Sequence, residues 1–165
     1  MCGLAGFLDN SHSLSSESLN ALSRKMSDTL KNRGPDDAGS WVDQKTGIAM
    51  SHRRLAIQDT SLAGHQPMVS KSGRYVIVYN GEIYNYKILR RELQKTGYVF
   101  RSQSDTEVLL AVVEVWGLNI SLDKFIGMFA FALWDKDNQE LYLVRDRVGE
   151  KPLYYGLFGN IILFG

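Results

Sequence analysis

The last third of the chain is a succession of four short apolar segments, and this pattern constrains the fold more than any other feature. The segments are MFAFALWD, ELYLVRD, PLYYGLF and NIILFG, with turn residues between them. Short apolar runs bounded by turn residues are typical of strands. Consecutive strands with short connections pair in antiparallel fashion, because parallel pairing needs a long crossover. We therefore expect antiparallel sheet in this region.

Three helices are predicted before this region. The segment LNALSRKMSDTL carries apolar residues at spacings of three and four, which is one face of a helix, and Gly34 in NRGPD suits its C-terminal end. KILRRELQKTG predicts a short helix that ends at Gly97. SDTEVLLAVVEVWG predicts a helix that begins with a capping box of Ser104 and Glu107 and ends at Gly117.

Further strands are predicted in CGLAGFL, GIAMSHRRLAI and RYVIVYNGEIY. In the last of these, Asn80-Gly81 lies between apolar runs, a pattern typical of a two-residue hairpin turn. Helices and strands thus occur in blocks and not in strict βαβ alternation. This order favours an α+β domain with antiparallel sheets.

The composition is that of an ordinary globular domain. The chain has 165 residues, which suits one domain, with 44% apolar residues and a net charge of +1. This charge offers no electrostatic footprint for nucleic acid or membrane. A single cysteine excludes an internal disulfide, and no apolar run approaches the roughly 18 residues that span a bilayer. We expect a cytoplasmic protein, and the apolar end NIILFG suggests a fragment of a longer polypeptide.

Metal and phosphate sites are not indicated. The three histidines share no ligand spacing, and neither CxxC nor HExxH occurs. The phosphate-loop patterns GxxxxGK[ST] and GxGxxG are also missing. We expect no metal site and no cofactor in this domain.

Cys2, the only cysteine, lies directly behind Met1. It is either a small residue filling a strand or an N-terminal nucleophile. If Met1 is removed, the thiol lies beside an α-amine whose unperturbed pKa of about 8 suits a general base. A terminal amine serves a Thr nucleophile in this way, so no separate histidine is required.

Other candidates also have two readings. Asn80 and Gly81 are either the hairpin turn or a pair of oxyanion donors. Arg54 is either a solvated strand residue or a clamp for a substrate carboxylate. Asp105 is either an acid favoured by a helix dipole or a partner for a substrate ammonium.

Together these segments resemble the glutaminase domain of class II glutamine amidotransferases, and most closely that of the asparagine synthetase family. The motifs MCGLAGF, NRGPDDAG, SHRRLAIQD, YNGEIYNY, RSQSDTEVLL, GMFAFALWD and RDRVGEKPLYYG occur in the order typical of that family, over essentially the whole chain. Two residues depart from the family pattern. Position 150 is usually apolar or basic but is Glu150 here, and position 58 is usually apolar but is Gln58 here.

The resemblance implies a four-layer αββα sandwich of the N-terminal nucleophile hydrolase type and a glutamine substrate. It implies that Cys2 attacks the glutamine amide, with Asn80 and Gly81 stabilising the oxyanion. The substrate-binding residues that it implies, besides Asn80 and Gly81, are Arg54 for the α-carboxylate, Asp105 with Glu82 for the α-ammonium, and Leu55, Ile57 and Gln58 along the pocket. Arg33 would support the site.

The resemblance also implies a partner. Residues 1–165 would be the glutaminase domain, and an ATP- and magnesium-dependent synthetase domain of the same polypeptide would use the ammonia. The complete polypeptide could form a homodimer. The SGGxDS loop expected of that domain is not in this sequence. A glutamine-binding or regulatory module without turnover, an amidase for another amide substrate, and a sugar-acid or peptide acceptor remain open.

Overall fold

The computed structural model describes residues 2–57 and 61–165. Within them lie nine strands, four α-helices and one 3₁₀ turn. The strands are β1 (Gly3–Asp9), β2 (Asp37–Asp43), β3 (Ile48–Arg54), β4 (Met68–Val69), β5 (Tyr75–Ile83), β6 (Gly127–Asp135), β7 (Glu140–Arg145), β8 (Tyr155–Phe158) and β9 (Ile161–Phe164). The helical segments are α1 (Ser16–Asp28), η1 (Leu62–Gly64), α2 (Tyr86–Lys95), α3 (Asp105–Trp116) and α4 (Leu118–Lys124).

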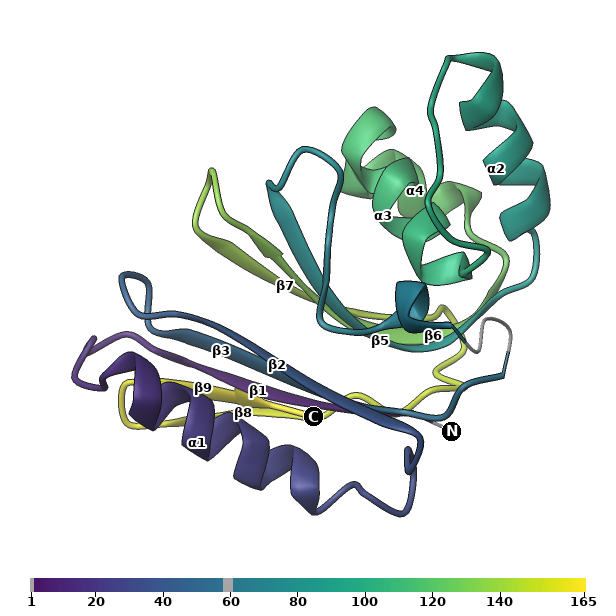
Figure 1. Cartoon of the computed structure of the whole chain (residues 1–165). Coiled ribbons are helices and arrows are strands. Elements are labelled where there is room, and N and C mark those ends of the chain that lie inside the picture. Colours follow the sequence, from purple (N-terminus) through teal and green to yellow (C-terminus); the bar gives the residue numbers. More distant parts are fainter. Residues whose placement is uncertain (1, 58–60) are drawn as a thin grey trace.

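The strands form two antiparallel sheets that pack face to face (Figure 1). One sheet has the order β2-β3-β1-β9-β8, and the other has the order β4-β5-β6-β7. Helix α1 covers the outer face of the first sheet, while α2, α3 and α4 cover the outer face of the second (Figure 1). The layers are therefore helix, sheet, sheet and helix, as the family resemblance implies.

The alternation of side chains along β5 explains how one strand serves two cores. Residues 75, 77 and 79 belong to the apolar cluster beneath the helices, and residues 76 and 78 belong to the cluster between the sheets. Successive side chains of a strand point to opposite faces, so a strand buried on both faces is apolar throughout. This alternation directs the next residue, Asn80, toward the sheet that contains β1.

The four predicted C-terminal strands are confirmed as β6, β7, β8 and β9. The helix that ends before Gly97 is confirmed as α2, and Gly97 has a φ of 88° that favours glycine. Four elements were not predicted, because none has a strong apolar pattern of its own: β2, η1, β4 and α4.

The predicted hairpin turn at Asn80-Gly81 is wrong. Strand β5 runs without a break through both residues, which pair with Ala130 and Phe129 of β6. A Cβ on Gly81 would lie 2.3 Å from the Met128 carbonyl oxygen, so glycine allows the close approach of the two strands. The tertiary pairing overrides the local turn preference.

The predicted end of the first helix at Gly34 is also wrong, because α1 ends at Asp28 with Thr29 as its C-cap. Gly34 has another use. A Cβ at this position would lie 2.3 Å from backbone atoms of Arg53, so the glycine lets the chain pass closely over the end of β3.

The capping box at the start of α3 is confirmed only in its first half. The Ser104 side chain accepts a hydrogen bond from the Thr106 N–H and caps the helix. The Glu107 carboxylate does not return to the Ser104 N–H. It accepts instead from the N–H groups of Arg101 and Ser102 and so orders the segment before the helix.

Among the helices of the described residues, none is long and apolar enough to cross a membrane.

Candidate active site

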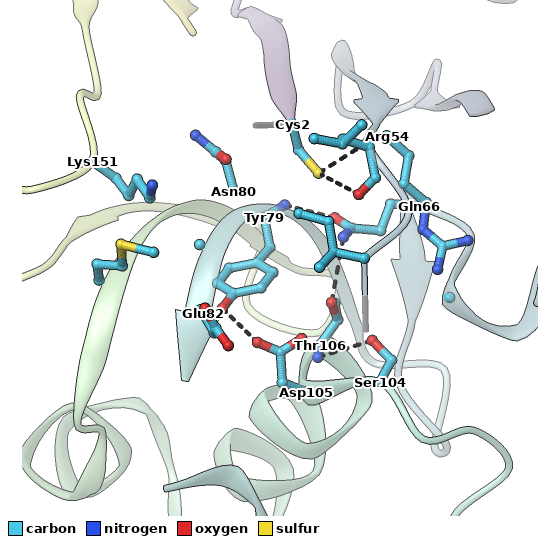
Figure 2. Close-up of a pocket in the computed structure, with 15 residues that line it drawn as sticks. Cys2, Arg54, Gln66, Tyr79, Asn80, Glu82, Ser104, Asp105, Thr106 and Lys151 are labelled. Carbon is cyan, nitrogen blue, oxygen red and sulfur yellow. Dashed lines mark hydrogen bonds between the residues drawn. The ribbon is translucent and has the colours of Figure 1, made fainter. Parts of the chain in front are cut away.

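A pocket lies where the ends of β1 and β3 meet β5 and the start of α3 (Figure 2). Its volume is about 130 Å³. The residues that line it are Cys2, Arg54, Leu55, Ile57, Gly64, Gln66, Tyr79, Asn80, Gly81, Glu82, Ser104, Asp105, Thr106, Met128 and Lys151. Figure 2 shows Cys2 and Asp105 at opposite ends of this set, with Tyr79 between them.

Most of the predicted site residues therefore meet in one place. Cys2, Arg54, Leu55, Ile57, Asn80, Gly81, Glu82 and Asp105 all line the pocket. Gln58 lies outside the described residues. Arg33 does not line the pocket, but its Nε donates a hydrogen bond of 3.2 Å to the carbonyl of Cys2 and holds that residue from behind.

Cys2 is half-buried immediately before β1. The Leu55 N–H lies 3.4 Å from its Sγ, and the Leu55 carbonyl oxygen lies 3.6 Å from the same sulfur. Together with the bond from Arg33, these contacts fix both the backbone and the thiol. Cys2 is thus held in place by partners from two other segments, although residues near a chain terminus are commonly loose.

The hydrogen-bond pattern of β6 decides where the Gly81 N–H points. Phe129, which lies opposite Gly81, donates its N–H to Asp146 Oδ2 at 3.1 Å and accepts the Asp146 N–H at 2.8 Å. Both of its backbone groups are therefore used on the side away from β5. Gly81 and Phe129 form a non-hydrogen-bonded pair, so the Gly81 N–H points to the free edge of β5.

Alternate N–H groups along that free edge have side-chain acceptors. The Tyr79 N–H donates to Gln66 Oε1 at 2.7 Å, and the Ile83 N–H donates to Asp105 Oδ2 at 3.0 Å. Between them, the Gly81 N–H has no acceptor among the described residues. Asn80, only 6% exposed, lies next to it and lines the same pocket. An amide N–H and a carboxamide thus lie together in the pocket that contains the Cys2 sulfur.

Arg54 is the last residue of β3, and its side chain is packed against the segment around η1. Its Nη1 donates to the Ser61 carbonyl at 2.9 Å. A Cβ on Gly64 would lie 2.1 Å from Nη2, so only glycine leaves room for the guanidinium. Arg54 is 8% exposed and lines the pocket, which suits a buried clamp for an anionic group.

Asp105 is the first residue of α3 and is 6% exposed. Its Oδ2 accepts from the Tyr79 hydroxyl at 2.8 Å and from the Ile83 N–H. Burial raises the pKa of this carboxyl, and the two hydrogen bonds oppose the rise. The N-terminal end of the helix also favours the carboxylate. The pocket therefore contains both a buried acid and a buried guanidinium.

Sequence reasoning missed several pocket residues. They are Gly64, Gln66, Tyr79, Ser104, Thr106, Met128 and Lys151. Tyr79 and Ser104 adjoin residues that the sequence singles out, so adjacency alone could have found them. Gln66 and Lys151 come from loops with no local pattern. Lys151 is 7% exposed, and its N–H is held by Asp146 Oδ2 at 3.0 Å.

Glu150 departs from the family pattern but lies outside the pocket, with an exposed side chain and its N–H bonded to Asp146. Over the part of the chain that the structure describes, no group of three or more His, Cys, Asp or Glu side chains gathers as metal ligands do.

Comparisons with known proteins agree with this geometry. The family described as "Glutamine amidotransferase domain" matches residues 1–165. Asparagine synthetase [glutamine-hydrolyzing] 3 of Bacillus subtilis (strain 168) is 41% identical over 100% of this chain and 26% of its own length. Asparagine synthetase [glutamine-hydrolyzing] 2 of the same organism is 40% identical over 99% of this chain and 21% of its own.

The glutamine phosphoribosylpyrophosphate amidotransferase from B. subtilis, solved with ADP and GMP, shares the fold. It superposes with a TM-score of 0.79 at 20% identity over 99% of this chain and 41% of its own. This likeness confirms the predicted fold of the N-terminal nucleophile hydrolase type. The chain spans about a quarter of the length of the curated relatives it matches. It belongs to the glutamine amidotransferase domain family, as a glutaminase domain of the asparagine synthetase type.

Proposed function

We propose that this domain hydrolyses glutamine to glutamate and ammonia, with Cys2 as an N-terminal nucleophile. The observation that carries the proposal is the meeting of four groups in one pocket: the Cys2 thiol, the Gly81 N–H beside Asn80, the buried Arg54 and the buried Asp105. The Gly81 N–H has no acceptor in the described part of the chain. A free amino acid that bears one amide needs a nucleophile, oxyanion donors, a cation and an anion.

Recognition of glutamine follows from these charges. The Arg54 guanidinium binds the α-carboxylate through two N–H donors. Asp105, assisted by Glu82, binds the α-ammonium. Leu55 and Ile57 line the wall along the side chain of the substrate.

The reaction proceeds through a thioester. Once Met1 is removed, the α-amine of Cys2 accepts the thiol proton while the sulfur forms a bond to the amide carbon. Asn80 and the Gly81 N–H stabilise the negative oxygen of the tetrahedral intermediate. The amine returns its proton to the leaving nitrogen, the C–N bond breaks, and ammonia departs. Water, deprotonated by the same amine, then attacks the thioester, and its collapse releases glutamate and restores the thiol.

The names of the relatives suggest how the ammonia is used. In the complete protein, an amide-forming domain that requires ATP and magnesium would take it up, with aspartate as the acceptor, as the name asparagine synthetase indicates. Such a protein would act in the cytoplasm, and its complete chain would form a homodimer.

The test is ammonia and glutamate release by the chain without Met1 and by its Cys2→Ala variant. The unsubstituted chain should turn over glutamine, and the variant should lose essentially all turnover with an unchanged melting temperature. Turnover by the variant would contradict the nucleophile assignment. Intact mass measured on each preparation reports whether Met1 is present, and a chain that retains Met1 should bind glutamine without hydrolysing it.

A further inference from the structure

Tyr79 is held at three points by side chains from three different segments. Its carbonyl oxygen lies 2.9 Å from His52 Nε2 of β3. Its N–H donates to Gln66 Oε1, from the loop that follows η1, at 2.7 Å. Its hydroxyl donates to Asp105 of α3 at 2.8 Å. Tyr79 directly precedes Asn80 and Gly81, the two proposed oxyanion donors.

The contacts of the Tyr79 N–H and carbonyl take the place of strand pairing, because β4 does not extend as far as Tyr79. The neighbouring strand β4 pairs with β5 only through Met68↔Ile77 and Val69↔Val76. After Ile77, the next residue of β5 whose backbone N–H and C=O point away from β6 is Tyr79. If β4 continued in the same register, Gln66 would pair with Tyr79. The Gln66 side chain takes the place of that backbone contact. Because a buried peptide group without a partner is costly, His52 and Gln66 complete the edge of the sheet where β4 has ended.

The hydrogen-bond partner fixes the state of His52. A carbonyl oxygen only accepts, so Nε2 carries the proton. His52 Nδ1 is buried and has no hydrogen-bond partner among the described residues. Burying Nδ1 without a partner costs less free energy when it carries a lone pair than when it carries a proton. Burial of the ring lowers the pKa of His52 to about 4. The side chain is 1% exposed, so His52 is a neutral donor inside the protein.

The His52–Tyr79 bond crosses from one sheet to the other beside the pocket. His52 pairs with Leu4 of β1, two residues after Cys2, and is two residues before Arg54. The nucleophile and the carboxylate clamp therefore belong to the sheet of His52, while the oxyanion donors belong to the sheet of Tyr79. His52 does not line the pocket and acts only through Tyr79.

We propose that His52, together with Gln66, is a positioning residue that fixes the Tyr79 peptide groups and thereby sets Asn80 and Gly81 at the correct place relative to Cys2. This inference rests on the proposed glutaminase function. A displacement of about 1 Å in a catalytic array can cost 10²-fold in rate. Loss of the bond should therefore lower kcat and leave the binding groups Arg54 and Asp105 largely unaffected.

The test compares His52→Asn with His52→Gln. The amide nitrogen of Gln reaches about as far as Nε2 of His, whereas that of Asn reaches only as far as Nδ1. His52→Asn should lower kcat for glutamine hydrolysis roughly 10- to 100-fold with KM changed less than about threefold. His52→Gln should restore kcat to within about fivefold of the unsubstituted chain. His12→Asn, at an exposed position with a φ of 51° that Asn tolerates, is the matched control and should leave both constants unchanged.

Equal losses of kcat in the Asn and Gln variants, or no loss in the Asn variant, would overturn the proposal. A second measurement does not depend on turnover or on the folding of variants. Nitrogen-15 spectra of the unsubstituted chain should show His52 as the neutral tautomer with its proton on Nε2, hydrogen-bonded and slow to exchange. A proton on Nδ1 would refute the proposal. If the unsubstituted chain hydrolyses no glutamine, the proposed function fails and the tautomer measurement still decides whether the contact exists.

Discussion

Asp105 has two tasks at one carboxylate. Its Oδ2 receives the Tyr79 hydroxyl and the Ile83 N–H, contacts that hold the edge of β5 against α3, while the same side chain lines the pocket. The Tyr79 hydroxyl and the Ile83 N–H both donate hydrogen bonds, and neither is charged. The negative charge of Asp105 therefore remains available to a cationic ligand. The two interpretations of Asp105 from the sequence are therefore compatible. It can be an acid favoured by the helix dipole and also the group that binds a substrate ammonium.

Asp105→Asn should weaken glutamine binding. The variant retains an oxygen for Tyr79 and Ile83 but loses the charge, and a hydrogen bond to a charged group contributes about 1.5–3 kcal/mol. KM for glutamine should rise at least about tenfold, with a smaller change in kcat. Steady-state kinetics measure the split. The control is Asp123→Asn, whose side chain is 90% exposed on α4, and an unchanged KM in the Asp105 variant would contradict the ammonium role.

Eight of the residues that line the pocket could be predicted, some from a motif with a chemical reason of its own, as with Cys2 behind Met1, and the others from the family resemblance. The roles proposed for His52 and Gln66 could not. Their importance lies in contacts between segments far apart in the sequence, such as the bond from His52 to Tyr79 across 27 positions. No local pattern records such a contact.

At the scale of elements, the start of α3 connects stability with the site. Ser104 caps the helix by accepting the Thr106 N–H at 3.1 Å, and the residue between them is Asp105. Ser15 caps α1 in the same manner, by accepting the Ser18 N–H at 3.3 Å, but α1 lies on the other side of the molecule (Figure 1). The two caps thus form a natural pair for comparison.

Ser104→Ala and Ser15→Ala should each lower the free energy of unfolding by about 1 kcal/mol, the usual contribution of an N-cap. Only Ser104→Ala should also raise KM for glutamine, because fraying of the first turn of α3 moves Asp105. Urea denaturation and steady-state kinetics on both variants check this. Equal KM values in the two variants would show that the start of α3 does not position the binding group.

Elements with a strong apolar pattern could be predicted, and those that depend on neighbours could not. The continuous apolar run YVIVY predicts a strand buried on both faces, but the continuation of the strand through Asn80-Gly81 depends on its pairing with β6. Strand β2, none of whose residues is fully buried, owes its position to pairing with β3.

At the scale of the whole molecule, His52 is a buried base that links the two sheets, and stability should report its titration. The pKa of His52 is lowered from 6.5 to about 4, chiefly by burial. Asp37 of β2, Arg54 of β3 and His65 also act on the ring: Asp37 raises its pKa, and Arg54 and His65 lower it. Above pH 6.5 the ring is neutral in both the folded and the unfolded states, so its contribution is constant.

Between pH 6.5 and about 4 the unfolded state binds a proton that the folded state does not, so stability falls as the pH falls. The fall attributable to His52 should reach about 3 kcal/mol. Other carboxyls titrate in the same window, and the comparison of the unsubstituted chain with His52→Gln removes their contribution. Urea unfolding at a series of pH values measures the difference. Parallel pH profiles for the two chains would contradict a neutral, buried His52.

The central claim is that the Cys2 sulfur forms a covalent bond to the glutamyl group during turnover. Rapid acid quenching of the chain lacking Met1 with glutamine, followed by intact mass measurement and peptide mapping, tests it most directly. The account predicts a transient adduct with the mass of glutamine less ammonia, confined to the N-terminal peptide and located on Cys2. Steady release of ammonia with no adduct, or with an adduct on another residue, would contradict it.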